Sequence, residues 1–144
     1  MTVWIAACNA APETPAAPAT ATTPQAPQAS QTPPLIPGMG NHHHPIVTKS
    51  SEAQQFFDQG FNFVFGFNHE EAVRSFRRAA ELDPKASMPH WGIAWALGPN
   101  YNLDVDEARA NQANVAIAQA LALSLSQGGS EIERAYIDAM AISL

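Results

Sequence analysis

Apolar side chains recur at helical spacing in five successive segments of residues 51–144, with polar residues between the segments. The first segment begins at Ser51, which together with Gln54 has the pattern of a capping box. Its apolar stripe consists of Phe56, Phe57, Phe63, Val64 and Phe67. The run "FNFVFGF" also alternates as a strand would, but the helix-start signal and the helical segment behind it favour a helix.

A polar break at Asn68 separates the first stripe from the second and is expected to cap the next helix, with Glu71 at its third position. His69 precedes two glutamates, but a metalloprotease helix needs a second histidine four residues on, where Val73 stands. We therefore interpret these residues as an acidic first turn and expect His69 to be exposed to solvent. The helix should end before Pro84, because the residue preceding a proline avoids helical geometry. The two helices would form a hairpin.

Three further helices are expected. A short one in "ASMPHWGIAWALG" carries Pro89 in its first turn, where a missing N–H does no harm. A long Ala-rich helix is expected behind a cap at Asp104, with Glu107 at the third position, and its stripe would be Ala113, Ile117, Ala120 and Leu121. A fifth begins with a capping box of Ser130 and Glu133. Its expected buried face consists of Ile132, Ala135, Tyr136, Ala139 and Met140.

Residues 53–86 form a 34-residue unit whose packing positions resemble those of the tetratricopeptide repeat (TPR). The matching residues are Phe56, Gly60, Phe63, Ala72, Phe76, Ala79 and Pro84, whereas Gln59 replaces the usual leucine. A looser repeat would cover 87–126, and 130–144 would be the first helix of a third. The chain thus resembles an N-terminal fragment of bacterial TPR-containing proteins of uncharacterised biochemistry. The resemblance implies an all-α fold of stacked antiparallel helical hairpins, a TPR-like α-solenoid.

The expected helical domain, residues 49–144, follows a region of different composition. Residues 9–48 include a Pro/Ala/Thr/Gln-rich run with few large apolar side chains, which predicts a disordered linker and lead-in. Before it, "IAAC" resembles the end of a bacterial lipoprotein signal peptide. Residues 1–8 are therefore a candidate truncated signal, with Cys8 as the lipidation site. The alternative is a plain disordered N-terminus. The first reading implies a lipid-anchored protein of the bacterial cell envelope or periplasm, and the second a cytoplasmic one.

Charge narrows the class of partner. The chain has a net charge of −6 and a pI of about 5.2. Arg74, Arg77 and Arg78 have glutamates within helical reach, so no basic patch is expected and nucleic-acid binding is disfavoured. The single cysteine forms neither an intrachain disulfide nor a cysteine-based zinc site.

The run "GNHHHP" contains the candidate metal ligands. A flexible loop could bring His42 and His44 together, and histidine-rich tracts bind transition metals weakly. No cysteine and no paired acid nearby in the sequence completes such a site. The alternative is a lead-in segment that packs on the first helix through Pro45, Ile46 and Val47.

By the resemblance, the first helix of each hairpin lines a concave groove. The groove residues would be Phe57, Phe61, Val64, Phe65, Met88, Trp91 and Trp95. Because Phe57 and Phe61 stand where the carboxylate-clamp subgroup has Lys and Asn, recognition of an acidic peptide C-terminus is not expected. An apolar groove suits a hydrophobic segment. The alternative is that these residues are core, or are covered by the chain's own "PLIPGM" and "PIVT" segments.

Together these patterns predict a non-catalytic scaffold that binds a protein or peptide through the concave face of its repeats. No cofactor is expected, and membrane contact would arise only through Cys8. No phosphate-binding loop, Ser-His-Asp order or carboxylate pair points to catalysis. The alternative is the N-terminal part of a larger enzyme or metal-handling protein, whose chemistry lies beyond Leu144 or in His42 and His44.

Overall fold

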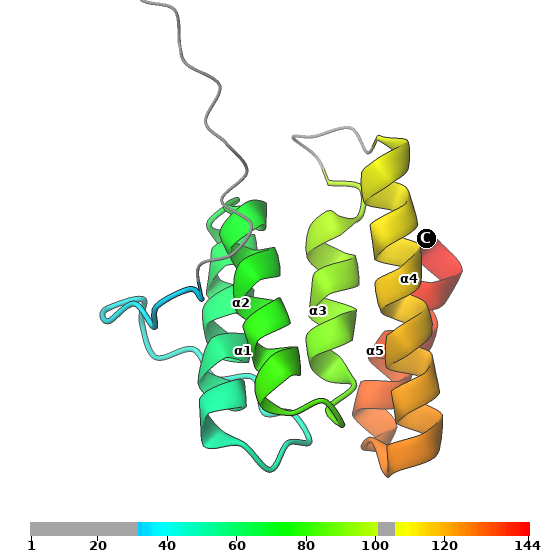
Figure 1. The fold of residues 1–144 in the computed structure, drawn as a ribbon, viewed down its shortest axis with the longest axis horizontal. Helices are drawn as coiled ribbons and strands as arrows, with labels where there is room; N and C mark the ends of the chain where they lie inside the picture. The colour runs from blue at the N-terminus through cyan, green and yellow to red at the C-terminus, as the bar shows by residue number, and fades with distance from the viewer. Residues whose placement is uncertain (1–31, 101–105) are drawn as a thin grey trace, which may run out of the picture. The chain divides into compact units, whose positions relative to one another are not determined.

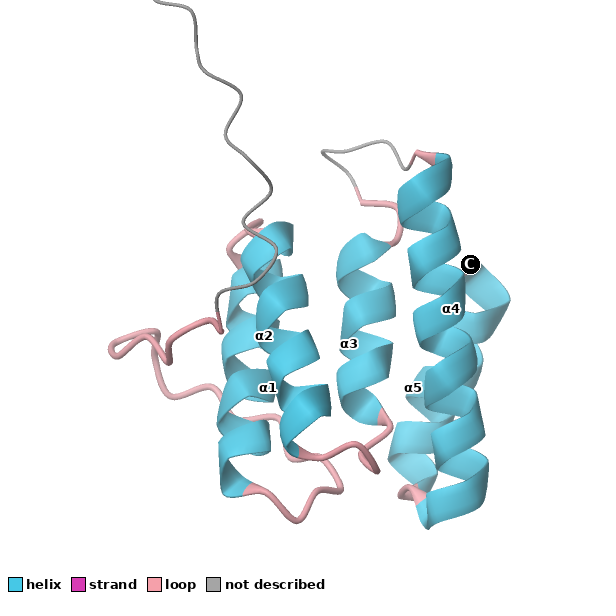
Figure 2. Ribbon diagram, in the orientation of Figure 1, coloured by secondary structure: helices cyan, strands magenta, loops and turns pink. Residues whose placement is uncertain are grey.

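The computed structural model describes residues 32–100 and 106–144. Over these ranges the chain is all-helical, with no strand, which confirms the all-α part of the expected fold class and is compatible with an α-solenoid (Figures 1 and 2). The helices are α1 (Ser51–Phe65), α2 (His69–Leu82), α3 (Met88–Leu97), α4 (Glu107–Leu123) and α5 (Glu131–Ser143). A π-helical turn, η1 (Ser124–Gly128), prolongs α4. None of the helices in the described ranges is long and apolar enough to cross a membrane.

Three of the predicted helix starts are confirmed. The side chain of Asn68 accepts a hydrogen bond from the backbone N–H of Glu71 at 3.4 Å and caps α2. Ser130 and Glu133 form the reciprocal capping box of α5. Pro89 lies in the first turn of α3, as expected.

Two predicted caps are wrong by a residue or two. α1 is capped by Ser50, whose Oγ accepts the N–H of Ala53 at 3.1 Å, so Ser51 is already helical. Extended backbone persists to Ser50 because Lys49 is held to a distant carboxylate, described below. The cap of α4 is Asp106, which accepts the N–H of Arg109 at 2.8 Å. The predicted cap, Asp104, lies outside the described residues.

The ring of Phe76 on α2 fills the space between α1 and α3. A Cβ atom added to Gly60 of α1 would lie 2.7 Å from this ring, and one added to Gly92 of α3 would lie 2.6 Å from it. Such distances are shorter than any ordinary contact, so the absence of a side chain at both glycines allows the three helices to meet. Each helix also packs against the next along the chain, and α3 contacts both α1 and α5 (Figure 1).

Most of the seven repeat-pattern residues are core residues. Phe76 and four others of them are buried, whereas Phe63 is half-buried and Pro84 is exposed; the other four are Phe56, Gly60, Ala72 and Ala79. Phe67, predicted in the first stripe, instead lies in the turn after α1, with a positive φ of 58° and 68% of its surface exposed. The helix has already ended at Phe65, so Phe67 cannot continue the stripe.

The buried face of α4 is as predicted, and that of α5 is not. Ala113, Ile117 and Ala120 are buried on α4, with Leu121 half-buried. On α5 the buried residues are Glu133 and Ile137. The predicted stripe is exposed at Ile132, Ala135, Tyr136 and Ala139, and half-buried only at Met140. The carboxylate-bearing residue Glu133 thus lies on the buried face of α5, which the apolar pattern alone did not reveal.

Candidate functional site

Aromatic side chains from three helices form one connected surface, which we call the aromatic face. Its members are Phe61 and Phe65 of α1, Trp91 and Trp95 of α3, and Tyr136 of α5. Ring centroids are 5.1 Å apart for Phe61 and Trp95, and 5.8 Å apart for Phe65 and Trp95. Trp91 joins Trp95 at 5.2 Å and Tyr136 at 5.5 Å. Separations of this size are those of favourable offset or edge-to-face pairs.

The members of the aromatic face differ in their access to solvent. Phe65 is 66% exposed and Tyr136 43% exposed, while Phe61 and Trp95 are half-buried. Trp91 is buried, and its indole N–H donates to the carbonyl oxygen of Tyr136 at 3.1 Å. This bond fixes α5 against α3 at the edge of the face.

The other predicted groove residues lie beneath this surface. Phe57 and Met88 are fully buried in the core, and Val64 is buried as well. The ring of Phe57 lies 5.3 Å from that of Phe76, under the exposed layer. Of the predicted groove set, Phe61, Phe65 and Trp95 therefore reach the surface, Trp91 is a buried member of the face, and Phe57, Val64 and Met88 belong to the core.

An extended segment, residues 34–49, runs along α1 and is called the strap. Two glutamines of α1 hold its backbone in the same way. Gln59 donates to the carbonyl of Pro34 at 3.0 Å and accepts the N–H of Ile36 at 2.8 Å. Gln54 donates to the carbonyl of His44 at 2.8 Å and accepts the N–H of Ile46 at 2.9 Å. Each amide thus binds the C=O of one strap residue and the N–H two residues further on.

The histidine run belongs to the strap and is engaged by α1. Asp58 accepts the backbone N–H of His44 at 3.0 Å and lies 2.8 Å from Nδ1 of His43. The imidazoles of His42 and His44 both stack on Phe61, with centroids 5.1 and 5.0 Å away. No group of three side chains suited to hold a metal ion occurs within residues 32–100 and 106–144.

The C-terminal end of the strap is anchored by two further carboxylates. Asp83 accepts hydrogen bonds from the Thr48 hydroxyl at 2.7 Å and the Lys49 N–H at 2.9 Å. Burial acts to raise the pKa of Asp83, but these bonds and one from the Lys85 N–H outweigh it, so the pKa lies below its usual value. Glu133 accepts the N–H of Val47 at 2.6 Å.

Sequence reasoning missed the side chains that hold the strap. Polar residues on a helix are typical of a solvated face, so their pattern carried no signal for backbone binding. The one clue was Gln59, which stands where the repeat usually has leucine. Of the predicted strap contacts, only Ile46 packs on the core; Pro45 and Val47 are exposed.

His69 is not the exposed turn residue that was predicted. It is the first residue of α2 and is half-buried, and both ring nitrogens are buried with no hydrogen-bond partner among the described residues. Burial lowers the pKa of His69, and the positive charge of Arg109 lowers it further. A neutral imidazole at the start of α2 also avoids placing a cation at the positive end of the helix dipole.

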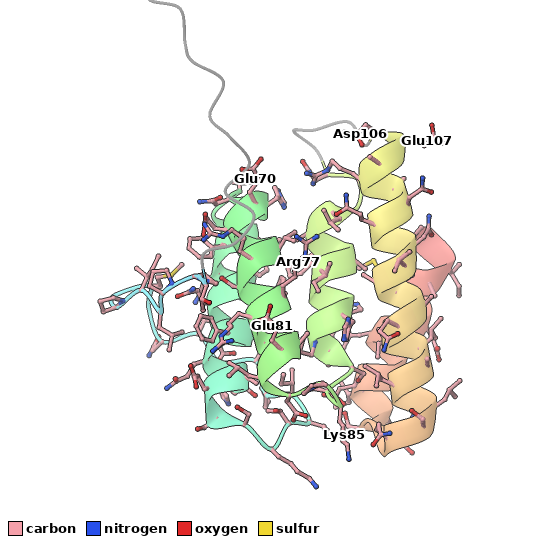
Figure 3. All side chains as sticks on the ribbon, viewed as in Figure 1. Glu70, Arg77, Glu81, Lys85, Asp106 and Glu107 are labelled. Atoms are coloured by element: carbon pink, nitrogen blue, oxygen red, sulfur yellow. The ribbon has the colours of Figure 1, made fainter. Side chains whose placement is uncertain are left out.

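Among the helices of the aromatic face, only α5 carries an arginine, Arg134. α1 and α3 contain no lysine or arginine, whereas α2 carries three arginines and α4 one. Arg74 pairs with Glu71 at 2.7 Å, and Arg78 with Glu81 at 3.1 Å. Arg77, labelled in Figure 3, donates to the side chain of Gln112 on α4 at 3.0 Å.

Comparisons of the chain with protein-family models, with curated proteins and with solved structures return no match. The class that the structure defines is therefore an all-helical domain compatible with an α-solenoid, with an aromatic face on α1, α3 and α5. The candidate lipidation site, Cys8, lies outside the described residues.

Proposed function

We propose that this protein is a non-catalytic protein–protein interaction scaffold of the tetratricopeptide type, whose aromatic face binds a segment of a partner protein. The helical hairpin of α1 and α2 packs against α3, as stacked repeats would. Phe61 and Trp95 are separated by the repeat length (95 − 61 = 34) and contact each other at 5.1 Å. Equivalent positions of successive units would thus form one continuous surface.

The observation that carries the proposal is the exposure of large aromatic rings that touch one another. Phe65 contacts both Phe61 and Trp95, yet two thirds of its surface is open to water. Clustered exposed aromatics are unfavourable in water and are typical of interaction sites. Trp and Tyr are also the residues that most often dominate binding energy at interfaces.

The polar groups beside the face support binding rather than catalysis. Asp58 and Glu133 both accept backbone N–H groups of the strap, so their carboxylates serve a structural purpose. A general base has to be within reach of a substrate proton. Carboxylates already engaged by the protein's own hydrogen-bond donors are poorly suited to that task.

The proposal is tested by site-specific photo-crosslinking in cells that carry the native gene. A benzophenone amino acid replaces Phe65 on the face or, as the matched control, Phe67. Both positions are about two thirds exposed, but Phe67 makes none of the ring contacts of the face. We expect a partner adduct from position 65 that is absent from position 67 and is lost on Trp95→Ser. Identical adducts from both positions would contradict the proposal.

The proposed location is the bacterial cell envelope, with the helical domain tethered through a lipid on Cys8. Support comes from the "IAAC" pattern and the Pro/Ala-rich run that follows it. Membrane fractionation of the native gene product tests the tether. We expect Cys8→Ser to release the protein from the membrane fraction, and retention of the variant there would contradict this location.

A further inference from the structure

We propose that the segment bound by the aromatic face presents an arginine, whose guanidinium stacks on the exposed ring of Phe65 beside Trp95. This inference rests on the proposed function and names the chemistry of the partner. It follows from the distribution of charge, from the groups that already stack on Phe61, and from the shape of the guanidinium ion.

Charge segregation favours a cation on this face. α1 and α3 carry Glu52 and Asp58 and no lysine or arginine, and α5, which supplies Tyr136, carries three acidic residues and one arginine, Arg134. The arginines of α2 are instead engaged with partners on α2 and α4, such as Glu81 and Gln112. An incoming cation would meet aromatic π faces and acidic groups, without repulsion from a resident cation on α1 or α3.

The electrostatic influence of the acidic groups on this face is visible at His44. Burial lowers the pKa of His44, and the charge of His42 adds to that effect. The carboxylates of Asp58 and Glu133 oppose it, so their negative potential reaches an imidazole that stacks on Phe61. Burial outweighs this potential at His44, but over the exposed ring of Phe65 burial would not oppose a charge, and the same potential would attract a cation there.

The strap shows which shape of group the face accepts. The imidazoles of His42 and His44 are planar nitrogen-containing groups, and they lie nearly parallel to Phe61, at 18° and 13°. A guanidinium is likewise planar and stacks parallel to aromatic rings, and it is weakly hydrated. The ammonium group of lysine is compact and strongly hydrated, so it fits this mode of binding less well.

The rings left for a partner lie beside Phe61 and are tilted against it. Phe65 lies 5.3 Å from Phe61 and is the most exposed ring of the face, and Trp95 contacts both of them. Tryptophan gives the strongest cation–π attraction of the aromatic residues. An arginine placed here would cover the exposed ring of Phe65, and the outer edge of its guanidinium would stay in contact with water.

The test uses three fluorescein-labelled peptides of alternating glycine and arginine, lysine or citrulline, bound to the full chain and followed by fluorescence anisotropy at one ionic strength. Citrulline keeps the planar shape and removes the charge. We expect the arginine peptide to bind about three- to thirtyfold more tightly than the citrulline peptide, the range of a cation–π contact. The lysine peptide should fall between them.

Two variants separate stacking from general attraction to an acidic protein. Trp95→Leu and Phe65→Leu keep the charge and an apolar side chain but remove a π face, and we expect each to reduce arginine binding at least about threefold. Phe67→Leu, the matched control, should not change it. Because Phe65 is exposed, its variant remains informative even if Trp95→Leu perturbs folding, which circular dichroism will show.

Two results would overturn the inference. Equal binding of the arginine and lysine peptides, unchanged by Phe65→Leu, would mean attraction to net negative charge only. Binding of the citrulline peptide as tight as that of the arginine peptide, lost on Phe65→Leu, would overturn the need for a cation while supporting the proposed function. The proposed function is tested separately: identical crosslinked adducts from positions 65 and 67 would contradict it.

Discussion

The carboxylate of Glu133 on α5 accepts the backbone N–H of Val47 in the strap at 2.6 Å, across 86 residues of sequence. Its other oxygen accepts the N–H of Ser130 at 3.1 Å and completes the capping box. A single buried side chain therefore joins the start of the last helix to the segment that precedes the first. This side chain lies on α5, the helix that supplies Tyr136 to the aromatic face.

Replacing Glu133 by alanine should cost about 2–3 kcal/mol in the free energy of unfolding, because two charge-assisted hydrogen bonds are lost in a buried place. Urea denaturation followed by circular dichroism measures the loss. Glu131→Ala is the matched control, since Glu131 is exposed in the same first turn and should cost less than about 1 kcal/mol. Equal losses in the two variants would show that the link to Val47 contributes nothing.

Gly92→Ala should destabilise the fold by about 1–3 kcal/mol, because the new methyl group would meet the Phe76 ring at 2.6 Å. The change opposes the preference of alanine for helices, roughly 1 kcal/mol in the other direction. Gly66→Ala is the control, since its nearest neighbour would be an ordinary 3.4 Å away. Thermal unfolding of both proteins gives the comparison. A melting temperature raised in Gly92→Ala, as helix propensity alone would give, would disprove the close approach of α3.

If a smaller side chain at Phe76 restores part of the stability lost in Gly92→Ala, the loss is caused by contact with the Phe76 ring. Phe76→Leu leaves more space, so its cost should be smaller in the Gly92→Ala background than in the wild type. A double-mutant cycle on the same unfolding data measures the coupling. Purely additive losses would mean that Gly92 is disfavoured for a reason other than its contact with Phe76.

Sequence patterns predicted the helices because their signals are local. A cap such as Asn68, the proline after Asp83 and the helical stripe of α4 act within a few residues, and all are found in the structure. The 34-residue pattern also identified Phe76 and Gly60 as packing residues, and their contact is among the closest in the core.

The strap and the true face of α5 could not be predicted because their determinants lie far apart in the sequence. Gln59 binds a segment some 23 residues away, and Glu133 one that is 86 residues away. The predicted stripe of α5 was the more apolar one, yet the structure buries Ile137 beside a carboxylate. Burial of a charged group depends on a partner that periodicity does not reveal.

Gln59→Leu would restore the residue usual in the repeat and should release the start of the strap. The amide of Gln59 binds Pro34, Ile36 and the hydroxyl of Ser75, and leucine can make none of these bonds. We expect faster hydrogen exchange at the Ile36 amide, measured by mass spectrometry, with a loss of about 1–2 kcal/mol in stability. The control is Gln55→Leu, an exposed neighbour on α1. Unchanged exchange at Ile36 would show that the strap is held without Gln59.

His44 should make the stability of the protein fall in mild acid. Burial first, and the charge of His42 second, lower its pKa in the folded state, while Asp58 and Glu133 oppose the shift and His43 adds to it. The unfolded chain, with a histidine pKa of about 6.5, therefore binds more protons in the window below that value. Stability is full above pH 6.5 and declines as pH drops through the window to the folded-state pKa.

The variant His44→Phe keeps a ring on Phe61 and keeps the backbone N–H that Asp58 accepts, but it cannot take up a proton. The difference in melting temperature between pH 7.5 and pH 5 should therefore be smaller in the variant than in the wild type. Some pH dependence will persist, because burial also lowers the pKa of His69 and of His90. An identical difference in both proteins would mean that His44 takes up a proton without cost, and that its stacking on Phe61 does not require the neutral ring.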